Sequence, residues 1–158
     1  MDSASPLLVK FASRLAPGRA LDLACGAGRN ATWLTEQGWT VTAVDKSAAY
    51  SQALLADLEK GEFRVEEGVW DLILMSHYLQ RDLFEPVKRG LRPGGLAIVI
   101  VHLFEPGHES SRFSLHPGEL VAYFDGWEIL HSHEGKPTHN PVGRAVAEVV
   151  VRKPSPWI

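Results

Sequence analysis

The chain has 158 residues with a formal net charge of -3, and 45% of them are hydrophobic. This length is enough for one well-buried core, so we expect a single domain spanning residues 1–158. Lys and Arg are scattered along the sequence without a basic run, which argues against nucleic acid as a partner.

The lone Cys25 allows no internal disulfide. We find neither an export-signal pattern at the start nor an apolar stretch long enough for a membrane span. The sequence therefore favours a cytoplasmic protein that meets neither membrane nor nucleic acid.

In chain order, apolar spacing predicts alternating helices and strands. The first helix has Leu7, Leu8, Phe11 and Leu15 on one face and stops before Pro17-Gly18. Predicted helices cover residues 5–15, 30–38, 47–58, 82–89 and 117–124, and predicted strands cover residues 20–23, 40–44, 70–75, 96–101, 127–131 and 145–151. The last two strands form an antiparallel hairpin with a loop at residues 132–143. This order predicts an α/β fold with a doubly wound, mostly parallel sheet.

The most informative segment is LDLACGAGRN at residues 21–30, followed by TVTAVD, which ends at Asp45. Gly26 and Gly28 allow the backbone to turn sharply and to approach a ligand closely. An acid at the end of the second strand of a β-α-β unit can accept both hydroxyl hydrogens of a ribose. The first loop and the following helix N-terminus hold the rest of such a ligand. The segment predicts a nucleoside-cofactor site.

Four segments together resemble the class I S-adenosylmethionine-dependent methyltransferases over nearly the whole chain. They are LDLACGAGRN at 21–30, VTAVDKS at 41–47, WDLILM at 70–75 and LRPGGLAIVIV at 91–101. Within that family the chain is similar to small TehB-type bacterial enzymes, whose glycine loop is also followed by Arg-Asn. The resemblance implies a Rossmann-like fold, S-adenosyl-L-methionine as cofactor, and direct displacement of its methyl group by a small-molecule acceptor.

The resemblance also implies roles for individual residues. Asp22 would orient the glycine loop or the methionine amino group, Asp45 would bind the ribose, and Lys46 would lie beside the adenine. The expected cofactor-binding residues are Asp22, Ala24, Cys25, Gly26, Gly28, Arg29, Asn30, Asp45, Lys46, Asp57 and Ser76. The candidate catalytic residues His77, Tyr78 and His102 follow strands whose carboxyl ends face the ligand in open α/β sheets. Each position also has a purely structural interpretation: a turn, a packing or a loop residue.

The chain departs from the family between Asp45 and Asp71, where roughly 25 residues leave room for one helix and its connections. Relatives usually insert a helix, a strand and a further helix there. We therefore expect the edge strand to be missing or reduced to a trace at residues 62–65. Asp57 is then the acid able to meet the adenine amino group. Ala24 replaces a glycine of many relatives, which is tolerable if that position keeps a negative φ.

Acceptor specificity is expected from the leading helix and the loops at residues 103–116 and 132–143. Glu105, His108 and Arg112 in the first loop suit a small polar or anionic acceptor, such as a thiol or a chalcogen oxyanion. Arg112→Ala should then weaken acceptor use and spare cofactor affinity. His131 and His133 could chelate a metal with Glu134 or His139. We predict no metal site, because surface histidines are common and sulfonium transfer needs no metal.

Two other functions remain open. Gly26, Gly28 and Ala31 satisfy a dinucleotide fingerprint, which suggests a nicotinamide-dependent oxidoreductase. Asp22 would crowd a pyrophosphate with like charge, and no sequence remains for a domain that presents substrate to a nicotinamide. The shortened middle segment favours instead a catalytically silent nucleoside-binding module. A short sheet edge is also compatible with a homodimer.

Overall fold

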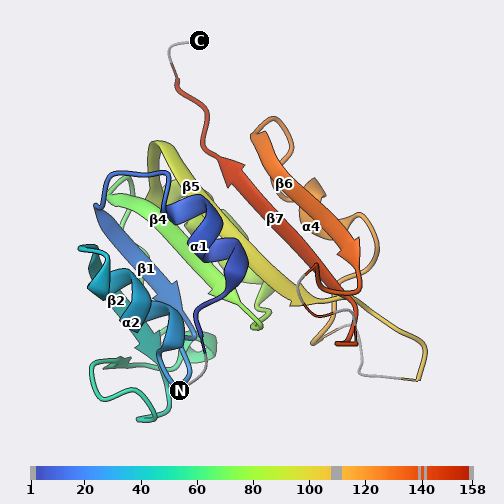
Figure 1. Ribbon diagram of the computed structural model, residues 1–158, viewed down its shortest axis with the longest axis horizontal. Coiled ribbons are helices and arrows are strands. Elements are labelled where there is room, and N and C mark those ends of the chain that lie inside the picture. The colour runs from blue at the N-terminus through green and yellow to red at the C-terminus, as the bar shows by residue number, and fades with distance from the viewer. Residues whose placement is uncertain (1–2, 108–111, 139, 141, 157–158) are drawn as a thin grey trace.

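The computed structural model describes residues 3–107, 112–138, 140 and 142–156. Seven strands form one sheet in the order β3-β2-β1-β4-β5-β7-β6 (Figure 1). The strands are β1 (Arg19–Leu23), β2 (Thr40–Asp45), β3 (Leu54–Leu55), β4 (Trp70–Ser76), β5 (Leu91–His102), β6 (Glu128–Gly135) and β7 (Val146–Arg152). Strands β1 to β5 pair in parallel, and β7 pairs antiparallel with β5 and β6. The Rossmann-like sheet with a C-terminal antiparallel hairpin is confirmed.

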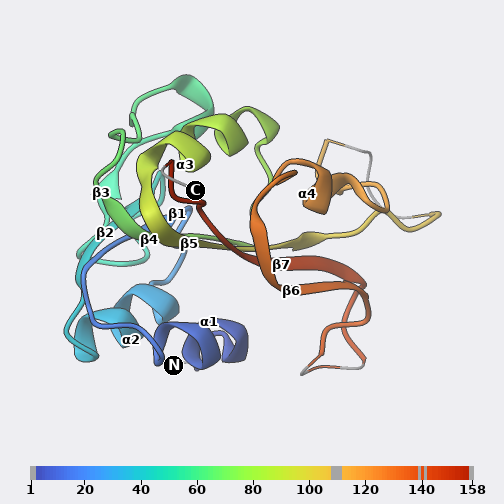
Figure 2. The ribbon, with the colours of Figure 1, turned by 90° about the horizontal axis from the view of Figure 1, so that it is seen from above.

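Helices cover both faces of the sheet, α1 and α2 on one and α3 and α4 on the other (Figure 2). The helices are α1 (Pro6–Ala12), α2 (Arg29–Glu36), α3 (Phe84–Gly90) and α4 (Glu119–Ala122), with 3-10 turns η1 (Leu58–Lys60) and η2 (Arg81–Leu83). Strand residues alternate between two cores. Leu72 and Leu74 of β4 pack toward Leu8 of α1, while Ile73 and Met75 lie in the other core. Among the described residues, no helix is long and apolar enough to cross a membrane.

The segment after β2 differs most from expectation. The helix predicted at residues 47–58 is wrong: turns lead instead to β3, which pairs Val44 with Leu54 and Asp45 with Leu55. The reduced edge strand is therefore present, but at Leu54–Leu55 rather than at residues 62–65. Backbone pairing explains the difference, since the chain returns beside β2 and the Ala56 N–H donates to the Asp45 carbonyl at 3.0 Å. Long-range strand pairing outweighs a helical spacing of apolar residues here.

The ends of several other strands and helices differ by a few residues from the predicted ranges. Strand β5 begins at Leu91, five residues before the strand predicted at residues 96–101, and includes Pro93-Gly94-Gly95. Strand β6 runs on to Gly135, because β7 continues opposite it as far as Val146. Helices α1 and α4 are shorter than the apolar patterns suggested. His131 and His133 therefore both lie on the paired strand β6, although we expected the loop to begin at residue 132.

Candidate functional site

Three adjoining cavities lie where the parallel strands end. The glycine-loop cavity, of about 570 Å³, is lined by Asp22, Ala24, Cys25, Gly26, Ala27, Arg29, Asn30, Ser76 and His77. The Asp45 cavity, of about 140 Å³, is lined by Ala24, Asp45, Lys46, Ala56, Asp57, Leu58, Glu59 and Tyr78. The hairpin cavity, of about 240 Å³, shares Arg29 and His77 with the first. The glycine-loop cavity also shares Ala24 with the Asp45 cavity, so it lies between the other two cavities.

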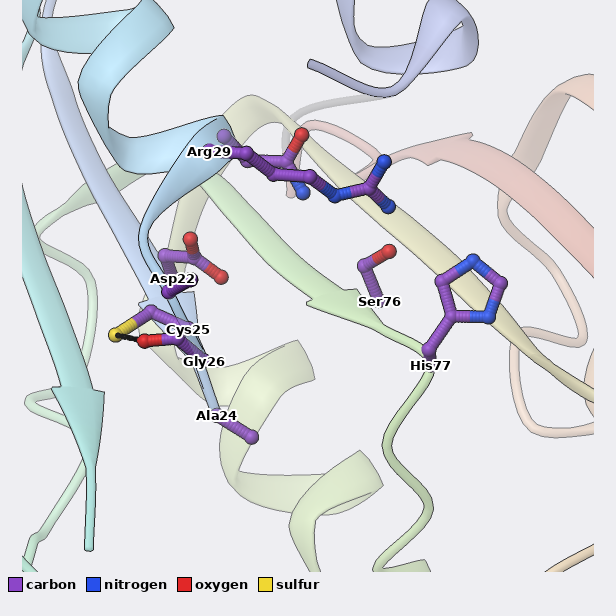
Figure 3. Close-up of a pocket in the computed structure, with 9 residues that line it drawn as sticks. Asp22, Ala24, Cys25, Gly26, Arg29, Ser76 and His77 are labelled. Carbon is purple, nitrogen blue, oxygen red and sulfur yellow. Dashed lines mark hydrogen bonds between the residues drawn. The ribbon is translucent and has the colours of Figure 1, made fainter. Parts of the chain in front are cut away.

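In the glycine-loop cavity, a carboxylate and a hydroxyl have unused hydrogen-bonding capacity. Asp22 is only 2% exposed, and within the described part of the chain neither its Oδ2 nor the buried Ser76 Oγ has a hydrogen-bond partner. The pKa of Asp22 is raised to about 7, mainly by burial. The positive charge of Arg29 lowers this pKa, and the negative charge of Asp45 raises it further. Figure 3 shows Asp22, Arg29, Ser76 and His77 around this cavity. A ligand with a cationic or N–H group would satisfy both oxygens.

Two residues on the same cavity have strained backbones. Ala24, just after β1, has φ +61°, and His77, just after β4, has φ +57°. The left-handed region costs a residue with a Cβ roughly 1–2 kcal/mol. The condition under which we expected alanine to be tolerated here, a negative φ, is therefore not met: the chain turns so that the Cys25 N–H can donate to the Val44 carbonyl at 3.0 Å. Strain at two neighbouring strand ends is typical of a functional site.

The two glycines of the loop serve different purposes. Gly26 has φ +57° and open space where a Cβ would stand, and its N–H donates to Asp45 Oδ2 at 2.9 Å. Gly28 has φ +84° and begins α2, and a Cβ there would lie 2.3 Å from the Tyr50 ring. Gly28 thus lies beneath Tyr50 and lines none of the three cavities.

The next residues of the loop position the N-terminal segment. Asn30 is buried, and its Oδ1 accepts a hydrogen bond from the Ser5 N–H at 2.8 Å. Arg29 donates from Nη1 to the Ser3 carbonyl at 3.2 Å and extends over the cavity. Burial and the charges of two nearby aspartates raise the pKa of Cys25 to about 12, so the thiol stays protonated and is a poor nucleophile.

The Asp45 cavity presents acids from the end of β2 and from the segment that follows β3. Asp45 accepts from the Gly26 N–H through Oδ2 and from the Ser47 N–H through Oδ1 at 2.8 Å. Each carboxylate oxygen keeps a further lone pair for a ligand hydroxyl. Asp57 lies on the same wall, two residues after β3, and caps η1 by accepting from the Glu59 N–H. Lys46 completes the polar lining.

Of the three candidate catalytic residues, His77 and His102 lie together, whereas Tyr78 lines a different cavity. His77 lies on the glycine-loop cavity, whereas Tyr78 lines the Asp45 cavity and donates from its hydroxyl to Gln80 Oε1 at 2.6 Å. Burial raises the pKa of Tyr78 to about 12. His102 contacts His77 with ring centroids 5.6 Å apart. Burial, followed by the His102 charge, lowers the pKa of His77, so its imidazole is neutral at pH 7 and can accept a proton.

The loop after β5 approaches the cavities differently from our expectation. Arg112 pairs with Glu59 at 3.0 Å, and Glu59 lines the Asp45 cavity. Glu105 accepts from the Ala145 N–H at 2.8 Å, which fastens the loop to the start of β7. His108 lies outside the described residues. Arg112 therefore lies near the Asp45 cavity, where we expect the cofactor, and not near the hairpin cavity.

The histidines of the hairpin have partners other than a metal. His131 Nε2 lies 3.0 Å from Glu148 Oε1, and His133 Nε2 lies 2.6 Å from the Lys136 carbonyl. Glu134 accepts from the Gly118 N–H at 2.8 Å. His139 lies outside the described residues. Among the residues that the structure describes, no group of three or more His, Cys, Asp or Glu side chains could hold a metal.

Sequence reasoning missed Glu148, which is 6% exposed and lines the hairpin cavity. A signal was available, because Glu148 is the single acid in the apolar run AVAEVVV at residues 145–151. Unpaired acids are almost never placed in a strand buried on both faces. Tyr50 and Glu59 were also missed, and nothing in their local sequence marks them.

A family model described as a methyltransferase domain matches residues 3–128. The chain is 26% identical over 141 residues to hemagglutinin 1 of Eikenella corrodens, covering 76% of this chain and 47% of that protein. It is 23% identical over 148 residues to the probable S-adenosyl-L-methionine-dependent methyltransferase TehB of Haemophilus influenzae, covering 80% and 52%. The chain therefore spans about half the length of these curated relatives.

Solved structures have the same fold. The crystal structure of Haemophilus influenzae TehB matches with a TM-score of 0.81 at 22% identity, covering 97% of this chain and 63% of that one. A Burkholderia thailandensis 1,6-didemethyltoxoflavin-N1-methyltransferase, with bound 1,6-didemethyltoxoflavin and S-adenosylhomocysteine, matches with a TM-score of 0.68 at 19% identity. That match covers 94% of this chain and 76% of the other.

Proposed function

The chain belongs to the class I S-adenosylmethionine-dependent methyltransferases, and from this premise we propose that it transfers a methyl group from S-adenosyl-L-methionine to a small-molecule acceptor. The observation that supports this most directly is the line of three cavities with Asp22 and Asp45 on successive walls. An amino acid, a ribose and an adenine follow one another in the cofactor in the same way. The third cavity leaves a separate space for the acceptor.

The donor set of the first cavity fits the methionine end of the cofactor. Asp22 Oδ2 and Ser76 Oγ, both buried and unpartnered within the described chain, would accept from the ammonium group. The open space at the Gly26 Cβ position allows the ligand to approach the backbone closely. Arg29 at the start of α2 would pair with the carboxylate, aided by the free N–H groups of that helix end.

The second cavity fits the nucleoside. Asp45 retains lone pairs for the two ribose hydroxyls while its backbone partners hold the carboxylate in place. Asp57, directly after β3, would accept from the adenine amino group, with Ala56 and Leu58 as apolar walls. The short β3 still provides this acid because its pairing with β2 brings residues 56–58 beside Asp45.

The bound cofactor would supply a methyl group on a sulfonium, whose leaving group is a neutral thioether. The protein then mainly holds the acceptor in line with that methyl group and keeps water away. His77 lies on the wall shared by the cofactor and hairpin cavities, and its neutral imidazole can take up a proton released by the acceptor. Cys25, with its protonated thiol, would contact the cofactor only as a wall residue.

Calorimetric titration tests the cofactor part of this proposal. S-adenosylhomocysteine and S-adenosylmethionine should bind, whereas NAD should not. Asp45→Asn should weaken S-adenosylhomocysteine binding by about tenfold or more, because a carboxylate accepts strongly from hydroxyls and an amide does so less well. Asp125→Asn, at an exposed position beyond α4, is the matched control and should bind normally.

Transfer is tested separately with cofactor labelled in the methyl group. Label moving into any small molecule from a metabolite pool would support the enzyme and would exclude a silent binding module. Binding of NAD in place of S-adenosylhomocysteine would overturn the proposal in favour of an oxidoreductase. Cofactor binding without transfer to any acceptor would leave only the binding module.

A further inference from the structure

The hairpin cavity adjoins the reacting end of the proposed cofactor site. It lies between the N-terminal segment, the start of α2, the end of β4 and the β6–β7 hairpin. Arg29 and His77 belong to its wall and also to the wall of the glycine-loop cavity. Leu7, Ile100 and Val146 make the rest largely apolar. If methyl transfer is the function, on which this inference rests, the space fits the acceptor.

Glu148 is the one buried carboxylate of this cavity. It lies on β7 between Val146 and Val150, on the face covered by α1, and is 6% exposed. His131 Nε2 and Thr138 Oγ1 both bond to its Oε1, at 3.0 and 3.2 Å. In the described part of the chain no hydrogen bond reaches Oε2. Oε2 therefore keeps its lone pairs for a ligand donor in the cavity that Glu148 lines.

Electrostatics connects Glu148 to the reaction centre. Its charge acts on His77 and favours the protonated imidazole, although burial and His102 outweigh it and lower the pKa of His77 overall. The charged or titratable groups around this space are Arg29, His77, Glu148 and His131. Arg29 is expected to pair with the cofactor carboxylate. The charge left for the acceptor is then that of Glu148.

We propose that Glu148 binds the methyl acceptor through Oε2, and that the acceptor is a small amine or N–H heterocycle. A carboxylate accepts a hydrogen bond from the N–H of a neutral amine, and this bond strengthens as positive charge develops on the nitrogen during formation of the N–C bond. It would repel an oxyanion at the same place, and burial weakens the screening of that repulsion. Glu148 therefore selects against the chalcogen oxyanions that the sequence resemblance suggested.

The reaction balances with groups that the site contains. The acceptor nitrogen forms an N–C bond to the methyl group as the C–S bond breaks, and the bonding pair stays on sulfur. The N–H proton passes to the neutral His77 imidazole and then to solvent. The cavity of about 240 Å³ lies below the usual range of 300–1,000 Å³ for ligand pockets, which favours a small acceptor.

The test compares acceptor classes in wild type and Glu148→Gln. Imidazole, ethanolamine and benzylamine represent N–H acceptors, 2-mercaptoethanol a thiol and selenite an oxyanion, each with methyl-labelled cofactor. Glutamine keeps the shape and still accepts from His131 and Thr138, but it removes the charge. For N–H acceptors kcat/KM should fall by at least tenfold, while S-adenosylhomocysteine affinity stays within twofold. Glu128→Gln, an exposed acid at the start of the same hairpin, should behave as wild type.

Crystals of the S-adenosylhomocysteine complex soaked with the N–H compounds give a second measurement. A nitrogen within hydrogen-bond distance of Glu148 Oε2 would support the proposal. Equal N–H transfer by Glu148→Gln, transfer only to selenite or the thiol, or failure of every N–H compound to bind and react would overturn it. A wild-type protein that does not bind S-adenosylhomocysteine would instead refute the proposed function itself.

Discussion

Asp22→Asn should stabilise the cofactor-free protein and weaken cofactor binding. Asp22 is 2% exposed, and burial is the main reason that its pKa rises to about 7. In the unfolded chain the same carboxyl ionises near pH 4. When folding raises the pKa of an acid, the contribution of that acid to stability is complete at pH values below its pKa in the unfolded chain. This contribution is lost as the pH rises toward its pKa in the folded protein. The charged carboxylate therefore opposes folding at neutral pH.

The size of the effect follows from the two pKa values. A difference of about 3 between them corresponds to about 4 kcal/mol of stability lost by pH 8. At pH 5 only about 1–2 kcal/mol of this cost is present, because the folded protein keeps the proton while the unfolded chain releases it. Removing the charge should therefore raise the free energy of unfolding by about 2–3 kcal/mol more at pH 8 than at pH 5.

Urea unfolding followed by tryptophan fluorescence at pH 5 and pH 8 measures this difference. Asp125→Asn serves as an exposed control and should show no pH-dependent gain. Calorimetry at pH 8 should show S-adenosylhomocysteine binding to Asp22→Asn at least tenfold more weakly, because the partner of the ammonium group is lost. A stability difference that is the same at both pH values would refute the reasoning about burial. Unchanged cofactor affinity would refute the placement of the ammonium group.

Three further predictions concern the loop and the far side of the sheet. Ala24→Gly should raise the free energy of unfolding, measured with urea, by roughly 0.5–1 kcal/mol, because glycine removes the strain at φ +61°. A lower free energy of unfolding would contradict this prediction. Gly28→Ala should lower the free energy of unfolding by at least ~2 kcal/mol, because the added methyl group lies 2.3 Å from the Tyr50 ring. Adding Tyr50→Ser to this variant should recover part of the loss, and no recovery would exclude the clash. Hydrogen bonding from Arg81 lowers the pKa of Glu119 to about 2, so this acid stabilises above pH 4.5 and the benefit disappears as pH falls toward 2. Glu119→Gln should accordingly cost roughly 1–2 kcal/mol at pH 6 and much less at pH 2.5, and equal costs would refute the assignment.

Much of the fold could be predicted because its signals are local. The apolar runs that contain Ile73 and Ile98 are short, rich in hydrophobic residues and bounded by turn residues, which identifies buried parallel strands without any knowledge of their neighbours. Gly26 and Gly28 marked a left-handed turn because only glycine adopts it without strain. Asp45 was predicted to bind a ribose from its distance to that turn and its position at the end of a strand, and the structure places it on the lining of a cavity.

Structure that depends on contacts between residues far apart in the sequence could not be predicted from local patterns. Residues 47–58 have helical spacing, yet the unpaired edge of β2 draws them into turns and a two-residue strand. Arg112 bonds to Glu59, 53 positions earlier in the sequence, and Glu59 lines the Asp45 cavity. No local pattern encodes either partner.

By itself the sequence determined the family, the layering of the sheet and the glycine loop with its acid, because each depends on residue type and short spacing. Tertiary structure alone decided that Ala24 is strained, that Tyr78 faces a different cavity from His77, and that Glu148 is buried on the wall of the hairpin cavity. The physical reason is that burial and backbone angle at these positions are imposed by strand pairing and packing between segments far apart in the chain.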